Sequence, residues 1–228
     1  TFVRDVEHGE VVVIDKNGLQ SLKPFPTRAA RPCLFEYVYF SRPDSIVNGR
    51  SVYGVRQRMG QGLAREFPVD ADVVVPVPDS GVPAALGYAR ESGIPYEMGI
   101  IRSHYLGRTF IQPNQGARQK GVRMKHSPNR SVLEGKRVVL IDDSVVRGTT
   151  SAKLVRAVRA AGATEVIAAN KTMAEMKAML EVDSLGFLSV DGLYEAMDAG
   201  PRDPVNPQFT DHYFTGDYPT RLLDREIE

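Results

Sequence analysis

The chain has a single cysteine and almost no net charge, and both facts exclude classes of function. Cys33 is the only cysteine in 228 residues, so it cannot form an internal disulfide and cannot alone hold zinc or an iron–sulfur cluster. Lys and Arg number 29 against 28 Asp and Glu, and the resulting net charge of +1 gives no reason to expect nucleic acid or an acidic membrane surface as a partner.

Long apolar segments are lacking as well. No apolar run approaches the roughly 20 residues that cross a bilayer, and no secretory signal opens the chain, so we expect a cytoplasmic protein without a membrane partner. Hydrophobic residues make up 42% and charged residues 25%, which is typical of a globular protein with one domain. The chain begins at Thr1 rather than Met, so we expect a fragment or a processed product.

Two short patterns precede a proline-rich stretch at the start of the chain. A β-branched run over residues 10–14, a turn with Gly18 and a second run over residues 19–22 predict a hairpin. Prolines at positions 24, 26 and 32 are typical of a linker. We therefore place a boundary here, with a hairpin unit over residues 1–24 and the main domain over residues 25–228.

Strand and helix patterns alternate after the linker. Apolar runs predict strands over residues 73–75, 99–101, 137–141 and 164–169, and apolar residues at helical spacing predict helices near residues 52–63, 82–89 and 154–158. This order predicts an α/β fold with a mainly parallel twisted sheet flanked by helices. Ligands of such sheets bind outside the carboxyl ends of the strands, so the loops after Val75, Ile101 and Ile141 are expected to carry the chemistry. Residues 201–228 are expected to form loops or short helices.

The loop after Ile141 has the most informative pattern. The strand ends in Asp142 and Asp143, and Gly148 with three hydroxyl residues then opens a helix. Backbone N–H groups at a helix N-terminus bind phosphate, and acids at a strand tip accept hydrogen bonds from sugar hydroxyls or hold hydrated Mg²⁺. The pattern therefore predicts a site for ribose 5-phosphate. The alternative is an ordinary capped turn followed by a helix N-cap.

This loop resembles the phosphoribosyl diphosphate (PRPP) motif of type I phosphoribosyltransferases. Residues 35–45, 75–84, 104–111 and 187–190 also resemble, in the same order, the C-terminal synthase domain of glutamine PRPP amidotransferases. The resemblance implies the type I phosphoribosyltransferase fold over residues 25–228. It also implies that residues 1–24 are the remnant last hairpin of a glutaminase domain that is otherwise lacking.

The resemblance assigns roles to two loops. The loop at residues 76–81 is implied to bind pyrophosphate through Asp79, Ser80 and Gly81, with Ser80 joining Asp142 and Asp143 around Mg²⁺. A proline-rigid turn without a ligand is the alternative for this loop. The implied PRPP contacts of the second loop are Asp142, Asp143, Ser144, Arg147, Gly148, Thr149, Thr150 and Ser151.

Basic residues gather between positions 98 and 133, where no acid occurs; they are Arg102, Arg108, Arg118, Lys120, Arg123, Lys125 and Arg130. A solvated basic loop or a nucleic-acid contact could explain them. Their position after a strand favours a lid that closes over pyrophosphate, and the three glycines in the same stretch would make such a lid mobile. The resemblance implies that Lys125 and Arg108 act in catalysis together with Asp142 and Asp143. It also implies an ammonia path along Tyr105 and Ile111.

The implied reaction is the displacement of pyrophosphate at C1 of PRPP by ammonia, which gives 5-phosphoribosylamine in the first step of purine biosynthesis. The family's glutaminase uses an N-terminal cysteine, and Thr1 stands at the start here, so we expect use of free ammonia without glutaminase activity. A separate glutaminase domain, a second copy of the chain in a homo-oligomer and inhibitory purine nucleotides are the further partners that the resemblance implies. Asp211, His212 and Tyr213 stand where some members have cluster-binding cysteines, so no iron–sulfur cluster is expected.

Two points stay open. The chain looks shortened after Val166 by about one strand and a proline-containing connection, which could cost the sheet a strand or damage the acceptor side of the pocket. A nucleobase-salvage phosphoribosyltransferase and a non-catalytic PRPP-binding regulator are the alternative functions. The first would need an aromatic-lined hood for the base, and the second would need a DNA-binding module that residues 1–24 are too short and too strand-like to form.

Overall fold

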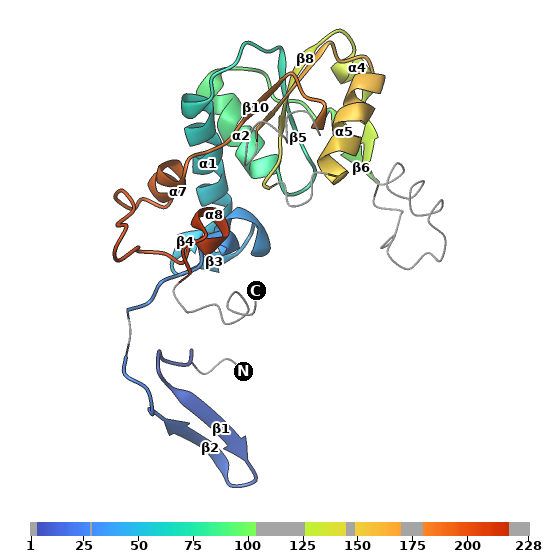
Figure 1. The fold of residues 1–228 in the computed structure, drawn as a ribbon. Helices are drawn as coiled ribbons and strands as arrows, with labels where there is room; N and C mark the ends of the chain where they lie inside the picture. The colour runs from blue at the N-terminus through green and yellow to red at the C-terminus, as the bar shows by residue number, and fades with distance from the viewer. Residues whose placement is uncertain (1–3, 28, 104–125, 145–148, 170–179, 219–228) are drawn as a thin grey trace, which may run out of the picture.

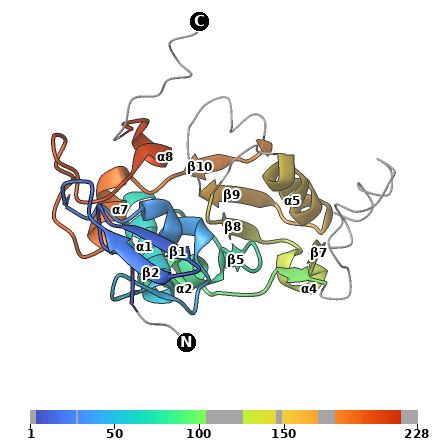
Figure 2. The same ribbon diagram turned by 90° about the horizontal axis from the view of Figure 1, so that it is seen from below.

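The computed structural model describes residues 4–27, 29–103, 126–144, 149–169 and 180–218. Its centre is a parallel sheet of four strands in the order β10, β9, β8 and β5 (Figures 1 and 2). The bounds of these strands are Ser184–Gly186 for β10, Glu165–Ala169 for β9, Arg137–Ile141 for β8 and Val73–Pro76 for β5. Pro76 lies opposite Ile141 in the register, so the loops that follow β5 and β8 begin side by side.

Helices cover both faces of this sheet, which explains why its strands are continuous apolar runs. The helices α1 (Val52–Glu66) and α2 (Val82–Ser92) pack on the face that Val74, Val139 and Ile141 present. The helix α5 (Thr149–Ala160) and the short α4 (Arg130–Leu133) pack on the opposite face (Figure 2).

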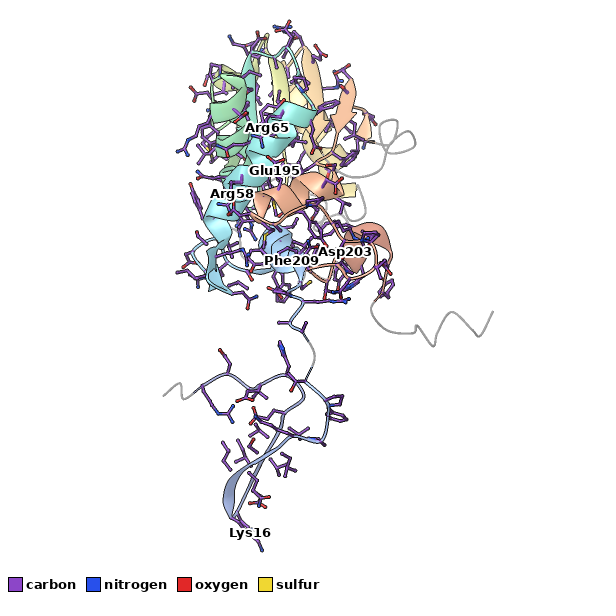
Figure 3. The ribbon with its side chains drawn as sticks, turned by 90° about the vertical axis from the view of Figure 1, so that its left-hand side faces the viewer. Lys16, Arg58, Arg65, Glu195, Asp203 and Phe209 are labelled. Carbon is purple, nitrogen blue, oxygen red and sulfur yellow. The ribbon has the colours of Figure 1, made fainter. Side chains whose placement is uncertain are left out.

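A third cluster of buried side chains lies on the far side of α1. It joins α1 to the π-helix η1 (Glu36–Phe40), to α7 (Val190–Ala196) and to Phe209 near the short helix α8 (His212–Thr215). Figure 3 shows Arg58 and Arg65 of α1 facing α7. Arg58 Nε donates to the Ala196 carbonyl at 2.7 Å, and Arg65 pairs with Glu195 at 2.9 Å.

The C-terminal segment is tied to this cluster through one buried carboxylate. Asp211 is 2% exposed and accepts hydrogen bonds from Tyr194 Oη at 2.7 Å and from Arg202 Nε at 2.6 Å. The Thr210 carbonyl accepts from the backbone N–H of Leu34 at 3.0 Å, so the two ends of the main domain lie side by side. The segment around Thr210 thus packs against the start of the domain.

The first strands form a hairpin that projects from the rest of the chain (Figures 1 and 3). The strand β1 (Val11–Asp15) pairs antiparallel with β2 (Gly18–Leu22), and Lys16 lies in the turn between them (Figure 3). Its apolar side chains are exposed, with Ile14 at 77% and Leu19 at 64%. An isolated two-stranded hairpin is marginally stable in water, so this unit needs a partner surface.

The predicted α/β class, the mainly parallel sheet and the N-terminal hairpin are confirmed. One predicted strand lies elsewhere, because β6 (Ile100–Arg102) pairs antiparallel with β7 (His126–Pro128) and is outside the four-stranded sheet. The short pairing of β3 (Ile46–Val47) with β4 (Arg50–Ser51), the helix α7 and the strand β10 were not predicted. Among the helices that the structure describes, none is long and apolar enough to cross a membrane.

The helices α1 and α2 approach so closely that two glycines form their contact. A Cβ atom on Gly60 would lie 1.9 Å from the Ala84 carbonyl oxygen, and one on Gly87 would lie 1.9 Å from the Gln57 carbonyl oxygen. Because both obstacles are backbone atoms, the helices would have to move apart to accept any side chain at these positions. Gly60 and Gly87 are therefore the residues that allow this packing.

We expect Gly60→Ala to destabilise the protein by about 2 kcal/mol or more, because the added methyl group has no space. Gly54→Ala in the same helix is the matched control, since its new Cβ would meet nothing closer than 3.7 Å. This control should stabilise the protein by about 0.5–1 kcal/mol through higher helix propensity. Urea denaturation measures both values, and equal effects of the two substitutions would contradict the close contact.

Candidate functional site

The candidate site lies where β5 and β8 end. Asp142 and Asp143 follow β8 directly, and the loop at residues 76–81 follows β5. The backbone N–H of Val77 donates to the Ile141 carbonyl at 2.8 Å, and a Cβ on Gly81 would lie 2.4 Å from that same oxygen. Only glycine fits at position 81, so the two loops are held in direct contact.

Asp143 is the centre of the polar contacts at this edge. Its carboxylate accepts a hydrogen bond from Ser144 Oγ at 3.0 Å, and the nearby hydroxyl of Ser80 acts to lower its pKa. Its Oδ2 atom is buried and has no hydrogen-bond partner within the described part of the chain. Asp142 Oδ1 accepts from the Asp143 backbone N–H at 2.9 Å, so the two acids lie against each other.

Burial disfavours the state in which both carboxylates of this pair are ionised. Burial, together with the neighbouring charge of Asp143, raises the pKa of Asp142 to about 7. Burial also raises the pKa of Asp143, although the hydroxyls of Ser80 and Ser144 and the charge of Arg56 act in the opposite direction. The pair would therefore gain from a bound cation or from hydroxyl groups that donate hydrogen bonds to it.

Arg56 is a buried cation near the pair that the sequence analysis missed. It is 3% exposed on α1, and its guanidinium donates to the carbonyls of Tyr37 at 2.7 Å and Ser41 at 2.8 Å. The sequence pattern could have indicated this residue, because an arginine between Val55 and Met59 interrupts the apolar stripe of the helix. Its role is to join η1 to α1 and to place positive charge behind the two acids.

A cavity of about 330 Å³ opens beside the acids, and it was not expected from the sequence. Asp142, Asp143 and Arg56 line its polar end together with the two serines. The remaining wall is apolar and comes from η1, α1, the segment after β10 and the C-terminal segment. The carboxylates thus border both the phosphate-binding loop predicted at residues 142–151 and an apolar space.

The loop after β5 carries an ion pair of its own. Arg102, at the end of β6, pairs with Asp79 in this loop. The backbone N–H groups of Val77 and Gly81 donate within the protein, so among the loop's N–H groups those of Asp79 and Ser80 are left to face an anion. The end of the second predicted strand therefore contacts the loop after β5, although that strand is outside the main sheet.

The structure brings together only part of the predicted site. Asp79, Ser80, Gly81, Asp142, Asp143 and Ser144 lie around the two strand tips, and Ser151 lies in the first turn of α5. Thr149 and Thr150 belong to the same turn by their backbone. The predicted residues that lie outside the described part of the chain are Tyr105, Arg108, Ile111, Lys125, Arg147 and Gly148.

We expect the effect of Asp142→Asn on the free energy of unfolding of the ligand-free protein to depend on pH. The substitution should be more favourable at pH 8 than at pH 4, by about 2 kcal/mol or more. The folded-state pKa of about 7 exceeds the ordinary value of 3.8, so the native state binds a proton in this range that the unfolded chain has lost. Stability of the parent protein should therefore fall as the pH rises from about 4 to 7, and asparagine should remove this loss.

Urea denaturation at a series of pH values checks this, without PRPP or divalent cations. Asp5→Asn, at an exposed position outside the main domain, is the control and should have nearly the same stability as the parent at every pH. A constant difference between Asp142→Asn and the parent across the series would show that the acid is not buried as described.

Comparison with known proteins identifies the family of the chain. The family model described as "Phosphoribosyl transferase domain" matches residues 45–175. The amidophosphoribosyltransferase of Rhizobium etli is 56% identical over 258 residues, which covers 100% of this chain and 52% of the relative. The amidophosphoribosyltransferase of Methanocaldococcus jannaschii is 46% identical, with 99% of this chain and 55% of the relative covered.

Two solved structures share the fold over nearly the whole chain. Glutamine PRPP amidotransferase from B. subtilis, complexed with ADP and GMP, has a TM-score of 0.82 and 43% identity and covers 98% of this chain. A structure described as the allosteric regulatory enzyme of purine biosynthesis also has a TM-score of 0.82, with 42% identity and 97% coverage. This chain covers 55% and 53% of those two chains.

The alignments also bear on the predicted shortening. The alignment with the Rhizobium relative has 258 positions against 228 residues here, so about 30 positions of the relative have no counterpart. β9 and β10 are neighbouring parallel strands of the sheet. The chain spans about half the length of its curated relatives. It belongs to the phosphoribosyl transferase domain family, has the predicted type I phosphoribosyltransferase fold, and matches the part of the amidophosphoribosyltransferases that its sequence resembles.

Proposed function

We propose that the chain binds PRPP at the tips of β5 and β8 and transfers the phosphoribosyl group to ammonia. The products are 5-phosphoribosylamine and pyrophosphate, as in the first step of purine biosynthesis. The observation that carries the proposal is the half-buried acid pair between the start of α5 and the loop after β5. Identity of 56% with an amidophosphoribosyltransferase over the whole chain favours ammonia as the acceptor.

Each part of the site has a role in this proposal. The carboxylates of Asp142 and Asp143 accept hydrogen bonds from the ribose hydroxyls, which relieves the cost of their burial. The N-terminus of α5, with Ser151 in its first turn, holds the 5-phosphate together with Arg147 and Gly148. The N–H groups of Asp79 and Ser80 face the diphosphate.

Mg²⁺ fits the donors of this site. Asp143 Oδ2 is a buried carboxylate oxygen without a partner among the described residues, and Mg²⁺ prefers oxygen ligands. Within the described ranges no three acidic, histidine or cysteine side chains gather to hold an ion by themselves, so diphosphate oxygens and water would complete its coordination. Asp142, Asp143 and Ser80 would hold the ion, and its chemistry is to neutralise charge on the leaving pyrophosphate.

The protein's own part in the reaction is positioning and charge compensation. The ammonia nitrogen attacks C1, the bond from C1 to the diphosphate oxygen breaks, and pyrophosphate leaves with the electron pair. One proton then passes from the nitrogen to solvent. Asp142 and Asp143 place negative charge near the sugar as positive charge develops on it. Lys125 and Arg108 are proposed to close over the diphosphate, and the lid excludes water that would hydrolyse PRPP.

The hairpin over residues 1–24 is proposed to be the last hairpin of a glutaminase domain. Its exposed apolar residues, with Ile14 at 77%, support a role in packing against a further unit. A glutaminase needs a thiolate nucleophile, and the only cysteine of the printed chain is Cys33, at the start of the main domain. We therefore expect this chain by itself to use ammonia and not glutamine.

Three further predictions concern regulation, assembly and location. Inhibition by purine nucleotides is supported by the ADP and GMP named with the B. subtilis relative. A homo-oligomer and a cytoplasmic location stay predictions, which sedimentation and cell fractionation would check.

The test of the proposed function is release of pyrophosphate from PRPP in the presence of ammonia and Mg²⁺, with a coupled trap for phosphoribosylamine. Asp143→Asn and Asp142→Asn should each lower turnover by at least about 100-fold, because the acids contact the reacting sugar. Asp5→Asn is the control and should keep the parent rate. Parent-like rates in the two site variants would exclude the site. Turnover only with a nucleobase would instead indicate salvage, and PRPP binding without turnover would indicate a regulator.

Removal of the divalent cation tests the proposed role of Mg²⁺. We expect excess EDTA to abolish ammonia-dependent release of pyrophosphate, and added Mg²⁺ to restore it, because the acid pair and the diphosphate otherwise repel each other. Calcium-free and calcium-saturated EGTA buffers at constant Mg²⁺ form the control, and rates in them should be equal. Full activity in EDTA would show that the site works without the ion.

A further inference from the structure

The cavity beside the acid pair is far larger than the acceptor of the proposed reaction. Its volume is about 330 Å³. Ammonia is about the size of water, whose share of liquid volume is about 30 Å³. The space would therefore hold roughly ten such molecules, and cavities of about 300–1,000 Å³ are the size that small organic ligands occupy.

The wall of this cavity suits an apolar or aromatic group. Met59 and Leu63 of α1 line it on one side, and Leu188 and Leu193 line it on another. These residues have no polar side-chain atom that could bind ammonia or water strongly, so filling the space with an apolar group would remove apolar surface from water.

Aromatic side chains form the part of the wall nearest the surface. Phe35 and Tyr213 both line the cavity and stack on each other, with ring centroids 4.6 Å apart and 23° between the planes. Tyr213 is 61% exposed, so the cavity reaches the surface of the described structure at this residue. An aromatic ligand that arrives here would meet ring faces and edges with which it can pack.

Two carboxylates and one guanidinium line the polar end of the cavity. The carboxylates are those of Asp142 and Asp143, and the one cation among the described lining residues, Arg56, already donates to two backbone carbonyls. Carboxylates accept hydrogen bonds but cannot donate them when ionised. An ionised carboxylate at this end therefore favours a group that carries N–H donors.

We infer that the cavity is an acceptor subsite for primary amines with an apolar or aromatic body, such as benzylamine. The inference rests on the proposed function and extends its acceptor beyond ammonia. The uncharged amine nitrogen attacks C1 of PRPP, the bond from C1 to the diphosphate oxygen breaks, and pyrophosphate leaves with the electron pair. One proton passes from the nitrogen to solvent, and the product is an N-substituted 5-phosphoribosylamine.

A nucleobase fits the polar end less well than an amine does. Recognition of a base edge needs donors as well as acceptors, and the ionised form of a carboxylate supplies acceptors only. The hydroxyl of Ser144 is engaged with Asp143. The experiment therefore also tests nucleobases as acceptors.

The experiment compares acceptors at saturating PRPP and Mg²⁺. Release of pyrophosphate is measured with ammonia, methylamine, butylamine and benzylamine, each corrected for its fraction of uncharged amine. We expect kcat/KM to rise from methylamine to benzylamine by at least about tenfold, because the larger body is buried in the cavity. A flat or falling series, with ammonia active, would overturn the subsite and leave the proposed function standing.

Two variants locate the effect in the cavity. Leu188→Trp fills the space and should lower the ratio of benzylamine to ammonia turnover by about tenfold or more. Tyr213→Ala removes half of the stacked pair at an exposed position, where folding is little affected, and should raise KM for benzylamine by at least about threefold. Val205→Trp is the matched control, since Val205 is 90% exposed and lines no part of the cavity, and its ratio should equal that of the parent.

The outcomes separate the two proposals. Inactivity with ammonia and with every amine would refute the proposed function itself. An unchanged ratio in folded Leu188→Trp, together with an unchanged KM in Tyr213→Ala, would show that the amine does not occupy the cavity. Consumption of adenine, hypoxanthine or orotate in place of the amines would assign the cavity to a nucleobase and overturn the inference.

Discussion

The tips of β5 and β8 are joined by a backbone contact on which the candidate site depends. The Val77 N–H donates to the Ile141 carbonyl, and Gly81 packs against that same oxygen. This contact brings Ser80 close to Asp143, and both acids are half-buried at the end of the sheet. Burial in turn makes the acid pair gain from a cation or a diol, which is the physical basis for binding a phosphorylated sugar there.

The helix α1 connects this edge to the rest of the domain. One side of it packs on the sheet and on α2, where Gly60 allows close approach, and the other side packs on η1 and α7. Arg56 lies between the two sides and brings positive charge to the acids. The cavity exists because η1, α7 and the C-terminal segment surround this helix without filling the space next to Asp142 and Asp143.

Much of the fold could be predicted from local patterns. Continuous apolar runs indicated β5, β8 and β9, because strands covered on both faces need apolar residues at every position. The partner of a strand is not local information, which is why β6 was expected in the main sheet and instead pairs with β7. β10 was missed for a similar reason, because three residues are too short for a periodic pattern.

The sequence by itself determined the α/β class, the hairpin and the motif with Asp142 and Asp143, because each depends on residues that are neighbours in the chain. Only the tertiary structure decided what surrounds the acids. Arg56, Phe35 and Tyr213 come from segments far apart in the chain, and no spacing shows that they line one cavity with Asp143. The elevated pKa of Asp142 has the same origin, because burial is a property of the whole packed domain and not of any single segment.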